Sequence, residues 1–124
     1  SKYEAGFVFT SGDENTSTFR MFGLFLDRIP KVDFTQGVTT NSKAMPARLL
    51  LLEENWYYCL ISLDSEKGLG VTIIDEKNPS RRTSLREKLS PAWKGLEWRM
   101  VAKANQGTSL ILDDFYLLSF NEVR

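Results

Sequence analysis

Residues 96–104 alternate strictly between apolar and polar side chains, and this alternation limits the possible folds of the chain more than any other feature. The apolar side chains occupy every second position: Leu96, Trp98, Met100, Ala102 and Ala104. The charged side chains between them are Glu97, Arg99 and Lys103. A period of two is typical of a β-strand with one buried face and one solvent-exposed face. We therefore expect residues 96–104 to form such a strand.

A second apolar run, residues 109–120, follows a short polar turn that contains Gly107. Two such runs separated by a turn predict a β-hairpin. The second run is interrupted by Asp113 and Asp114, although aspartate is uncommon in strands. A carboxylate on the core side of a strand needs a counter-charge or hydrogen bonds. Two explanations stay open: a bound calcium ion, or a bulge or strand end in which one aspartate is solvated and the other accepts backbone amides.

The remaining candidate strands are short and are separated by loops rich in turn-forming residues. They span residues 6–10, 19–26, 48–52, 56–63 and 69–75. This rhythm predicts an all-β fold: a two-sheet antiparallel β-sandwich of the jelly-roll type, galactose-binding-like or concanavalin-like. We expect the two ends of the chain to be adjacent in one sheet. A chain of 124 residues without an internal linker fits a single domain over residues 1–124.

Two segments also fit a helix. Pro46 is followed by good helix formers, and proline is tolerated in the first turn of a helix. Because the next segment, residues 56–63, is clearly a strand, we favour a strand over a helix at residues 48–52. Ser84 and Glu87 have the spacing of a capping box, and Pro91 would end a helix that began with them. One short helical turn there would fit a crossover loop between the sheets.

The sequence argues against membrane insertion and against catalysis. The longest apolar run, around Leu49, is much shorter than the roughly 20 residues that cross a bilayer. The chain has no histidine and one cysteine, Cys59, which excludes Ser–His and Cys–His nucleophiles and an internal disulfide. The carboxylate pairs 53–54, 75–76 and 113–114 are adjacent in sequence, whereas a glycosidase needs two carboxylates that converge. We expect Cys59 to be buried and inert, and the chain not to be an enzyme.

The stretches 98–104 and 107–117 together resemble the closing hairpin of jelly-roll carbohydrate-binding modules. They are also similar to the end of extracellular MAM domains, whose typical cysteines this chain lacks. Near the start, residues 3–6 (Tyr-Glu-Ala-Gly) are similar to the aromatic-Glu-x-Gly opening of such modules. The resemblance implies an extracellular or cell-surface protein and a structural calcium ion that joins the opening acidic residue to the closing aspartate. On that basis Glu4 and Asp114 are the candidate calcium ligands.

Carbohydrate recognition needs an exposed aromatic ring that stacks on a sugar, flanked by groups that form hydrogen bonds. Trp93, in a loop, is the best stacking candidate, although packing as a lid over the edge of the sandwich is an equal alternative. Tyr57 alternates with Trp56 and Tyr58, so one side of this trio is expected to be exposed, and Tyr57 is the second candidate. Trp98 leads the apolar face of its strand and is expected in the core.

Charge is balanced overall, but residues 77–103 carry a net charge of +6 and the remainder −6. Arg81, Arg82 and Arg86 are the candidate ligand contacts in this segment, where they would attract an anionic sugar or phosphate. Nucleic acid is not favoured, because no nucleic-acid-binding motif accompanies the arginines. Two alternatives stay open: a solvated mobile loop, and a phosphorylation site, since residues 81–84 have the spacing that basophilic kinases favour.

These observations favour a non-catalytic binding module, with carbohydrate as the ligand, attached to a larger extracellular or surface protein. The first residue is Ser1, and no signal or transit peptide is visible, which fits a module of a longer chain. The alternative is a protein–protein interaction or assembly domain of the same fold. In that case the aromatic trio and the basic stretch of residues 81–86 contact another protein. A small hydrolase is a third reading.

Overall fold

The computed structural model describes residues 5–64, 66–104 and 110–112. Within them the chain forms strands in two antiparallel sheets and one short 3₁₀ helix. The larger sheet has five strands in the order β4-β3-β2-β1-β8. Its strands are β1 (Ala5–Ser11), β2 (Arg20–Phe25), β3 (Lys31–Gln36), β4 (Thr39–Ala44) and β8 (Arg99–Ala104). The smaller sheet, in the order β5-β6-β7, consists of β5 (Tyr57–Asp64), β6 (Gly68–Asp75) and β7 (Arg82–Glu87).

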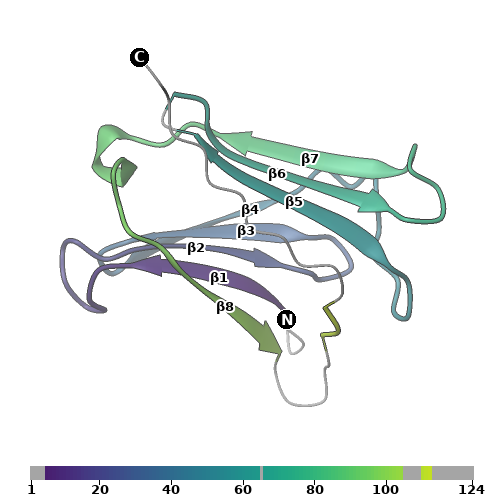
Figure 1. The fold of residues 1–124 in the computed structure, drawn as a ribbon, viewed down its shortest axis with the longest axis horizontal. Helices are drawn as coiled ribbons and strands as arrows, with labels where there is room; N and C mark the ends of the chain where they lie inside the picture. Colours follow the sequence, from purple (N-terminus) through teal and green to yellow (C-terminus); the bar gives the residue numbers. More distant parts are fainter. Residues whose placement is uncertain (1–4, 65, 105–109, 113–124) are drawn as a thin grey trace.

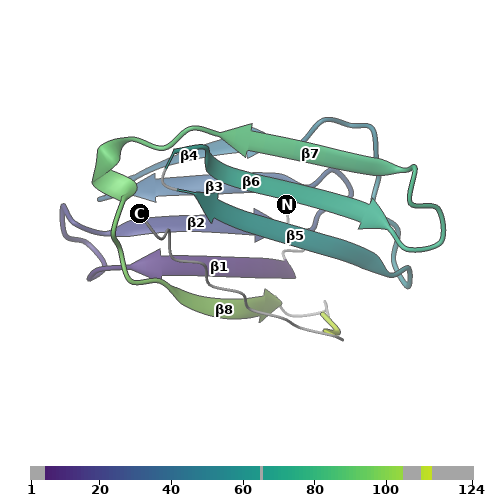
Figure 2. The same ribbon diagram turned by 45° about the horizontal axis from the view of Figure 1, so that its top comes forward.

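The three-stranded sheet lies over the five-stranded sheet (Figures 1 and 2), so the predicted all-β sandwich is confirmed. Strands β1 and β8, the first and the last that the structure describes, are hydrogen-bonded neighbours in the larger sheet. The two sheets differ by two strands, so the larger sheet extends past the smaller one. Strand β4, at its margin, is exposed at every position.

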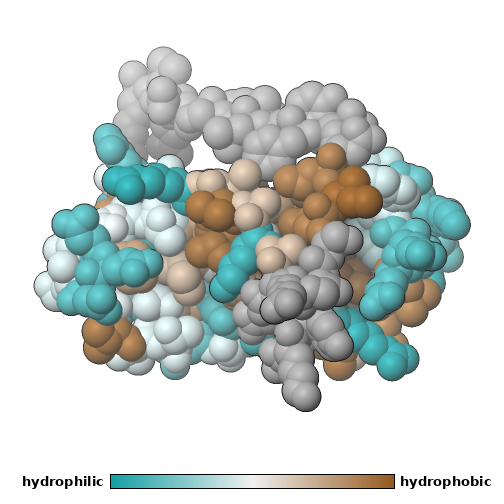
Figure 3. All heavy atoms as spheres, turned by 90° about the horizontal axis from the view of Figure 1, so that it is seen from below, coloured by the Kyte–Doolittle hydropathy of each residue, from teal (hydrophilic) through white to brown (hydrophobic). Residues whose placement is uncertain are grey.

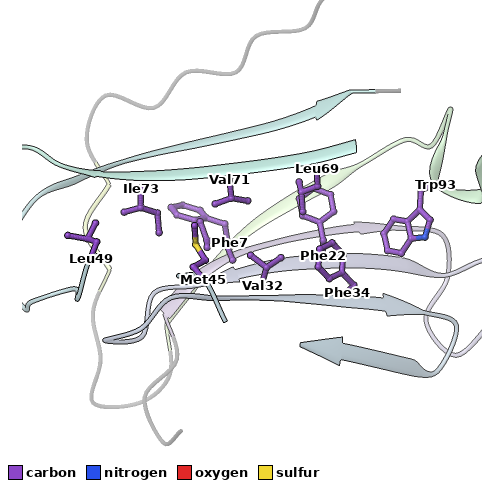
Figure 4. Close-up of a cluster of buried hydrophobic side chains, with 11 residues drawn as sticks. Phe7, Phe22, Val32, Phe34, Met45, Leu49, Leu69, Val71, Ile73 and Trp93 are labelled. Atoms are coloured by element: carbon purple, nitrogen blue, oxygen red, sulfur yellow. The ribbon is translucent and has the colours of Figure 1, made fainter. Parts of the chain in front are cut away.

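The core lies between the two sheets, as Figure 4 shows. The larger sheet contributes Phe7, Phe22, Leu24, Val32 and Phe34, and the smaller sheet contributes Leu69, Val71 and Ile73 from its central strand. These side chains occupy alternate positions on their strands, as one-sided burial requires. Each large apolar side chain that is fully buried contributes about 1.5–3 kcal/mol to folding. The packed inner faces therefore hold the outer faces of both sheets in place.

Residues 48–52 form neither the expected strand nor the alternative helix. They belong to the connection that crosses from β4 in the larger sheet to β5 in the smaller one. Leu49 is fully buried in this connection, and the amide of Leu51 donates a hydrogen bond to the carbonyl of Arg28 (2.8 Å). Leu49 and Leu51 therefore pack into the core instead of joining a sheet, whereas Leu52 is exposed. A crossing segment with buried apolar residues resembles a strand in sequence alone.

Strands β3 and β4 were not expected. They form a hairpin around Gly37, whose φ of 64° lies in the left-handed region that glycine adopts without strain. β4 carries polar side chains at nearly every position and is exposed on both faces, so it shows no apolar alternation. An edge strand of this composition leaves no periodic signal.

The segment expected to contain a helical turn is instead strand β7, which pairs with β6. Thr83 and Leu85 point toward the core, and the Thr83 hydroxyl donates a hydrogen bond to the carbonyl of Pro46 (2.8 Å). Pro91 begins the 3₁₀ helix η1 (Pro91–Trp93) rather than ending a helix. The fixed φ of proline suits a first helical position.

Strand β8 confirms a strand within residues 96–104, although it begins only at Arg99. As an edge strand of the larger sheet it is exposed at every position, so the buried face that the alternation predicted is not found among the described residues. It pairs with β1, with Phe7 opposite Ala102 and Phe9 opposite Met100. The run 109–120, its predicted hairpin partner, lies largely outside the described residues. In the part of the chain that the structure describes, no helix has the length and apolar character needed to span a membrane.

Candidate ligand-binding face

The outer face of the three-stranded sheet carries the most exposed aromatic side chains of the described chain. Along β5, Tyr57, Cys59 and Ile61 pack against the core, and the residues between them point outward. Tyr58 is 55% exposed and Leu60 54%. Trp56, one position before β5 and on the same side, is 45% exposed. We call this surface the β5–β7 face; its members are Trp56, Tyr58, Leu60, Ser62, Gly70, Thr72, Ile74, Arg82, Ser84 and Arg86.

The strand register arranges the β5–β7 face in rows. Tyr58, Ile74 and Arg82 form one row, Leu60, Thr72 and Ser84 the next, and Ser62, Gly70 and Arg86 the third. An apolar stripe therefore follows β5, hydroxyl groups lie in the middle, and arginines follow β7. Since neighbouring strands are spaced by about 4.8 Å, the two stripes are about 10 Å apart.

The two tyrosines of the aromatic trio exchange the roles that the sequence suggested. Tyr57 packs against the core, and its hydroxyl oxygen accepts a hydrogen bond from the amide of Leu52 (2.8 Å). Tyr57 therefore fastens the crossing connection to β5, and its ring does not face outward. Tyr58 and Trp56 present the exposed rings instead.

Trp93 is a core residue, contrary to the expectation of an exposed stacking ring. Only 7% of it is exposed, and its ring stacks on that of Trp98 with the centroids 5.9 Å apart. The edge of Phe34 meets it, and the Arg20 guanidinium lies 5.9 Å from the ring centre. The η1 turn directs the indole between the sheets, where Figure 4 shows it at one end of the core. The alternative, packing as a lid over the sandwich, matches this position, and Trp98 packs against the core as expected.

The three predicted arginines are exposed, but they differ in their partners. Arg81 lies 3.5 Å from the carboxylate of Asp75, in the turn between β6 and β7. Arg82 donates two hydrogen bonds from Nε and Nη2 to the carbonyl of Pro79 (2.9 and 2.8 Å), which fix its guanidinium near the same turn. Arg86 has no hydrogen bond or ion pair among the described residues.

Gly70 gives the Arg86 guanidinium its position on the face. A methyl group at Gly70 would stand 3.0 Å from an Arg86 nitrogen and 2.8 Å from the Ser62 hydroxyl oxygen. The guanidinium therefore extends across the middle strand toward β5, over the space that the missing side chain leaves. The sequence alone does not reveal this role of Gly70, because the residues that share its row are identified only by the strand register.

The basic residues of segment 77–103 do not form one surface. Arg82 and Arg86 lie on the β5–β7 face. Arg99 and Lys103 lie on the outer face of the larger sheet, because the residues that alternate with them on β8 pair with core-facing positions of β1. The single basic surface suggested by the sequence is therefore divided between opposite sides of the sandwich (Figure 1).

A groove of about 670 Å³ runs between the overhanging β4 and the chain after β7. Asn41, Thr39 and Gln36 line one side and Lys88 and Ser90 the other. An ion pair between Lys43 and Glu87 (2.6 Å) crosses from one sheet to the other beside it. The groove offers hydrogen-bonding groups, but its two aromatic residues, Phe34 and Trp93, are both buried, so it has no exposed ring for stacking.

The calcium prediction is not tested by the described residues, because Glu4 and Asp114 both lie outside them. Within residues 5–64, 66–104 and 110–112, no group of three or more acidic, cysteine or histidine side chains is placed to hold a metal ion. The Glu4 and Asp114 site stays a prediction from the sequence resemblance.

Cys59 lies on the inner side of β5, where burial raises the pKa of its thiol from 9.0 to about 11. The thiol is therefore protonated at neutral pH and is a poor nucleophile. This environment agrees with the inert cysteine that the sequence predicted.

Comparison of the chain with family models, with curated proteins and with solved structures finds no match in any of the three. What the protein does is therefore argued from its own surfaces. The exposed rings of Trp56 and Tyr58 and the Arg86 guanidinium over Gly70 are the features that the β5–β7 face brings together.

Proposed function

We propose that the chain is a non-catalytic carbohydrate-binding module of a larger extracellular or surface protein, and that glycans bind to its β5–β7 face. The observation that carries this proposal is the exposure of Tyr58 and Trp56 on a regular sheet face that also presents hydroxyl and guanidinium groups. Exposed aromatic rings on a rigid sheet are costly to leave in water unless they meet a ligand.

The arrangement provides the two contacts that sugars require. The face of an aromatic ring packs on the C–H surface of a pyranose, which Tyr58 and Trp56 offer along β5. Hydroxyl groups of the sugar meet the donors and acceptors of the middle rows, where Thr72 and Ser84 share a hydrogen bond of 2.9 Å. The sheet holds these groups in fixed positions, so binding orders few additional side chains.

A glycan-array screen of wild type, Tyr58→Ala and Trp56→Ala tests the proposal. We expect wild type to bind one class of glycan and both variants to bind it at least about tenfold more weakly, since rings at the centre of an interface carry much of its energy. Val38→Ala, which truncates an 81% exposed side chain in the β3–β4 turn, is the matched control and keeps full affinity. Full affinity in both aromatic variants contradicts the proposal.

The exposed apolar stripe of β5 also supports a second candidate, a protein-interaction or assembly domain. Leu60 lies between the tyrosine and serine rows and is 54% exposed, and an aliphatic side chain adds more to a protein interface than to a sugar site. Light scattering across a concentration series separates the two. A mass that rises with concentration in wild type, but not in Leu60→Ser, favours assembly; a constant monomer mass favours the glycan module.

A further inference from the structure

We infer that the row formed by Ser62, Gly70 and Arg86 is a carboxylate subsite, and that the glycan bound by the β5–β7 face is a polyuronate. This inference rests on the proposed carbohydrate-binding function and names the ligand class for the same face. Arg86 supplies the charge, Gly70 the space and Ser62 a neighbouring hydroxyl group.

The Arg86 guanidinium is placed for a ligand rather than for a neighbouring strand. It lies across Gly70, close to where a Cβ would stand, and has no ion-pair partner within the described chain. Arg81 and Arg82 differ in this respect, because Asp75 and the Pro79 carbonyl hold them at the turn. A planar guanidinium can bind a carboxylate through two parallel hydrogen bonds, which gives geometric selectivity as well as affinity.

The acidic residue at the same end of the face does not occupy this guanidinium. The Asp64 Oδ1 accepts hydrogen bonds from the amides of Lys67 (2.8 Å) and Glu66 (2.7 Å). The pKa of Asp64 lies below its usual range. The hydrogen bond from the Lys67 amide is the largest cause, followed by that from the Glu66 amide and by the nearby positive charges of Lys67 and Arg86. Asp64 thus closes the β5–β6 turn, and no residue that the structure describes accepts a hydrogen bond from the Arg86 guanidinium.

The distance between the charge and the rings favours a uronate. Arg86 lies four residues along β7 from Arg82, which shares a row with Tyr58. At about 3.4 Å per residue, the two rows are about 14 Å apart, a length that successive sugar rings of a polysaccharide span. A uronate carries its carboxylate directly on the pyranose, so one ring can stack on Tyr58 while the carboxylate of another reaches Arg86.

Binding to three polysaccharides tests the inference: polygalacturonate, the same polymer fully methyl-esterified, and dextran sulfate. The esterified polymer keeps the backbone and removes the charge, and dextran sulfate keeps the charge and removes the carboxylate. The proteins are wild type, Arg86→Gln, Gly70→Ala, Tyr58→Ala and Arg48→Gln. Arg48 is exposed in the loop between β4 and β5, so its variant changes net charge equally and off the face.

We expect wild type to bind polygalacturonate at least about tenfold more tightly than its ester, as the loss of a charged hydrogen bond predicts, and Arg86→Gln to lose that preference. Gly70→Ala displaces only the ends of two side chains. It should therefore weaken binding to polygalacturonate while its Tm equals that of wild type. Arg48→Gln keeps wild-type affinity.

Two results overturn the subsite. The first is equal affinity of wild type for polygalacturonate and its ester. The second is that Arg86→Gln and Arg48→Gln weaken binding to polygalacturonate equally while wild type prefers dextran sulfate, which indicates general charge attraction. The Tyr58→Ala arm keeps the two proposals apart. If Tyr58→Ala weakens binding to both polygalacturonate and its ester while Arg86→Gln weakens neither, the carbohydrate function stands and the subsite fails. If wild type binds no glycan, the proposed function itself fails.

Discussion

The outer faces of the two sheets differ in how far their aromatic and polar side chains are exposed or bonded within the protein. On the larger sheet, Phe25 is only 5% exposed, because its ring lies over Gly23 and the Lys31 ammonium stands 5.5 Å above it. Polar neighbours there bond to each other: Ser42 donates to the Asp33 carboxylate at 2.5 Å, with a Thr–Thr pair beside it. Seen from below (Figure 3), most hydrophobic residues of this side gather toward its middle and most hydrophilic residues toward its two ends.

On the β5–β7 face the hydroxyl groups of Thr72 and Ser84 bond to each other, but the aromatic rings stay open. Tyr58 is 55% exposed, and the Arg86 guanidinium lies over Gly70 without a hydrogen bond or ion pair to the described residues. Both faces belong to antiparallel sheets that cover the same core, so folding alone does not require the difference. On β2, β3 and β4 the larger sheet satisfies these outer side chains internally. The smaller sheet leaves Tyr58 and Arg86 exposed, as the proposed ligand site requires.

The largest expected effect comes from removing the aromatic ring on each face, Phe25 on the larger sheet and Tyr58 on the smaller one. Phe25→Ala should lower the free energy of unfolding by about 3 kcal/mol, because it removes a buried ring, and should leave glycan affinity unchanged in the folded protein. Tyr58→Ala should cost less than about 1 kcal/mol and abolish most of the affinity. Urea denaturation and a binding titration on the same samples check both. Equal destabilisation by the two substitutions would remove the distinction between the faces.

A calcium titration tests the predicted site at Glu4 and Asp114, which is separate from the proposed glycan site. If Glu4 and Asp114 hold calcium, the ion stabilises the folded chain by about 2.7 kcal/mol at one hundred times its dissociation constant. The Tm should therefore rise with calcium, fall on chelation, and stop responding in Asp114→Asn. Glycan affinity should depend on calcium only through folding. A Tm that is insensitive to calcium and chelator contradicts this site.

Cys59 provides a test on the inner side of the strand that carries Tyr58. Its pKa is about 11 in the folded chain and lower in the unfolded chain, where the thiol is solvated. The thiol thus contributes stability that is fully present below pH 9 and is lost as the pH rises through about 11. Because one pKa unit corresponds to about 1.4 kcal/mol, this contribution is about 2–3 kcal/mol.

Denaturation of wild type and Cys59→Ala between pH 7 and 11 isolates that contribution from the lysines and tyrosines that titrate in the same range. The difference in stability between the two proteins should shrink with rising pH. Ellman's reagent should react slowly with folded wild type at neutral pH. Rapid reaction would show that the inner side of β5 is open to solvent.

The smallest expected effect concerns the groove beside β4. Its ion pair joins Lys43 and Glu87, whose side chains are 50% and 29% exposed. Lys43→Gln should cost no more than about 1 kcal/mol, as solvated ion pairs do, and should leave glycan affinity unchanged. A large loss of affinity in this variant would move the binding site from the β5–β7 face to the groove.

The strands that alternate in sequence were predictable, and those that do not were missed. β6 has Leu69, Val71 and Ile73 on its buried side, and β8 keeps the period of two that marked residues 96–104. β3 and β4 escaped detection because β4 is a polar edge strand, and β7 was taken for a helical turn because Ser84 and Glu87 have capping spacing. β4 carries no apolar alternation, so its residues give no strand signal. β8 alternates although it is exposed at every position, so the alternation predicted the strand and not its burial.

The candidate site was predictable only in part. The aromatic trio and the arginines were singled out as candidates. The side of β5 that meets the core depends on the packing of the two sheets, so Tyr57 was named as the candidate ring although Tyr58 is the more exposed one. For Trp93, in a loop after Pro91, the sequence left ligand stacking and packing against the sandwich as equal alternatives, and the η1 turn directs it inward. The Arg86 position depends on the row that it shares with Gly70, which only the strand register reveals.

The central claim is that glycans bind to the β5–β7 face, and amide chemical-shift mapping tests it most directly. The isotope-labelled protein is titrated with the glycan that the array selects. The account predicts shifts that cluster in residues 56–62, 70–74 and 82–86, with little change in β2, β3 and β4. Shifts centred on β3 and β4, or confined to the chain around Trp93, would contradict it and place the ligand in the groove.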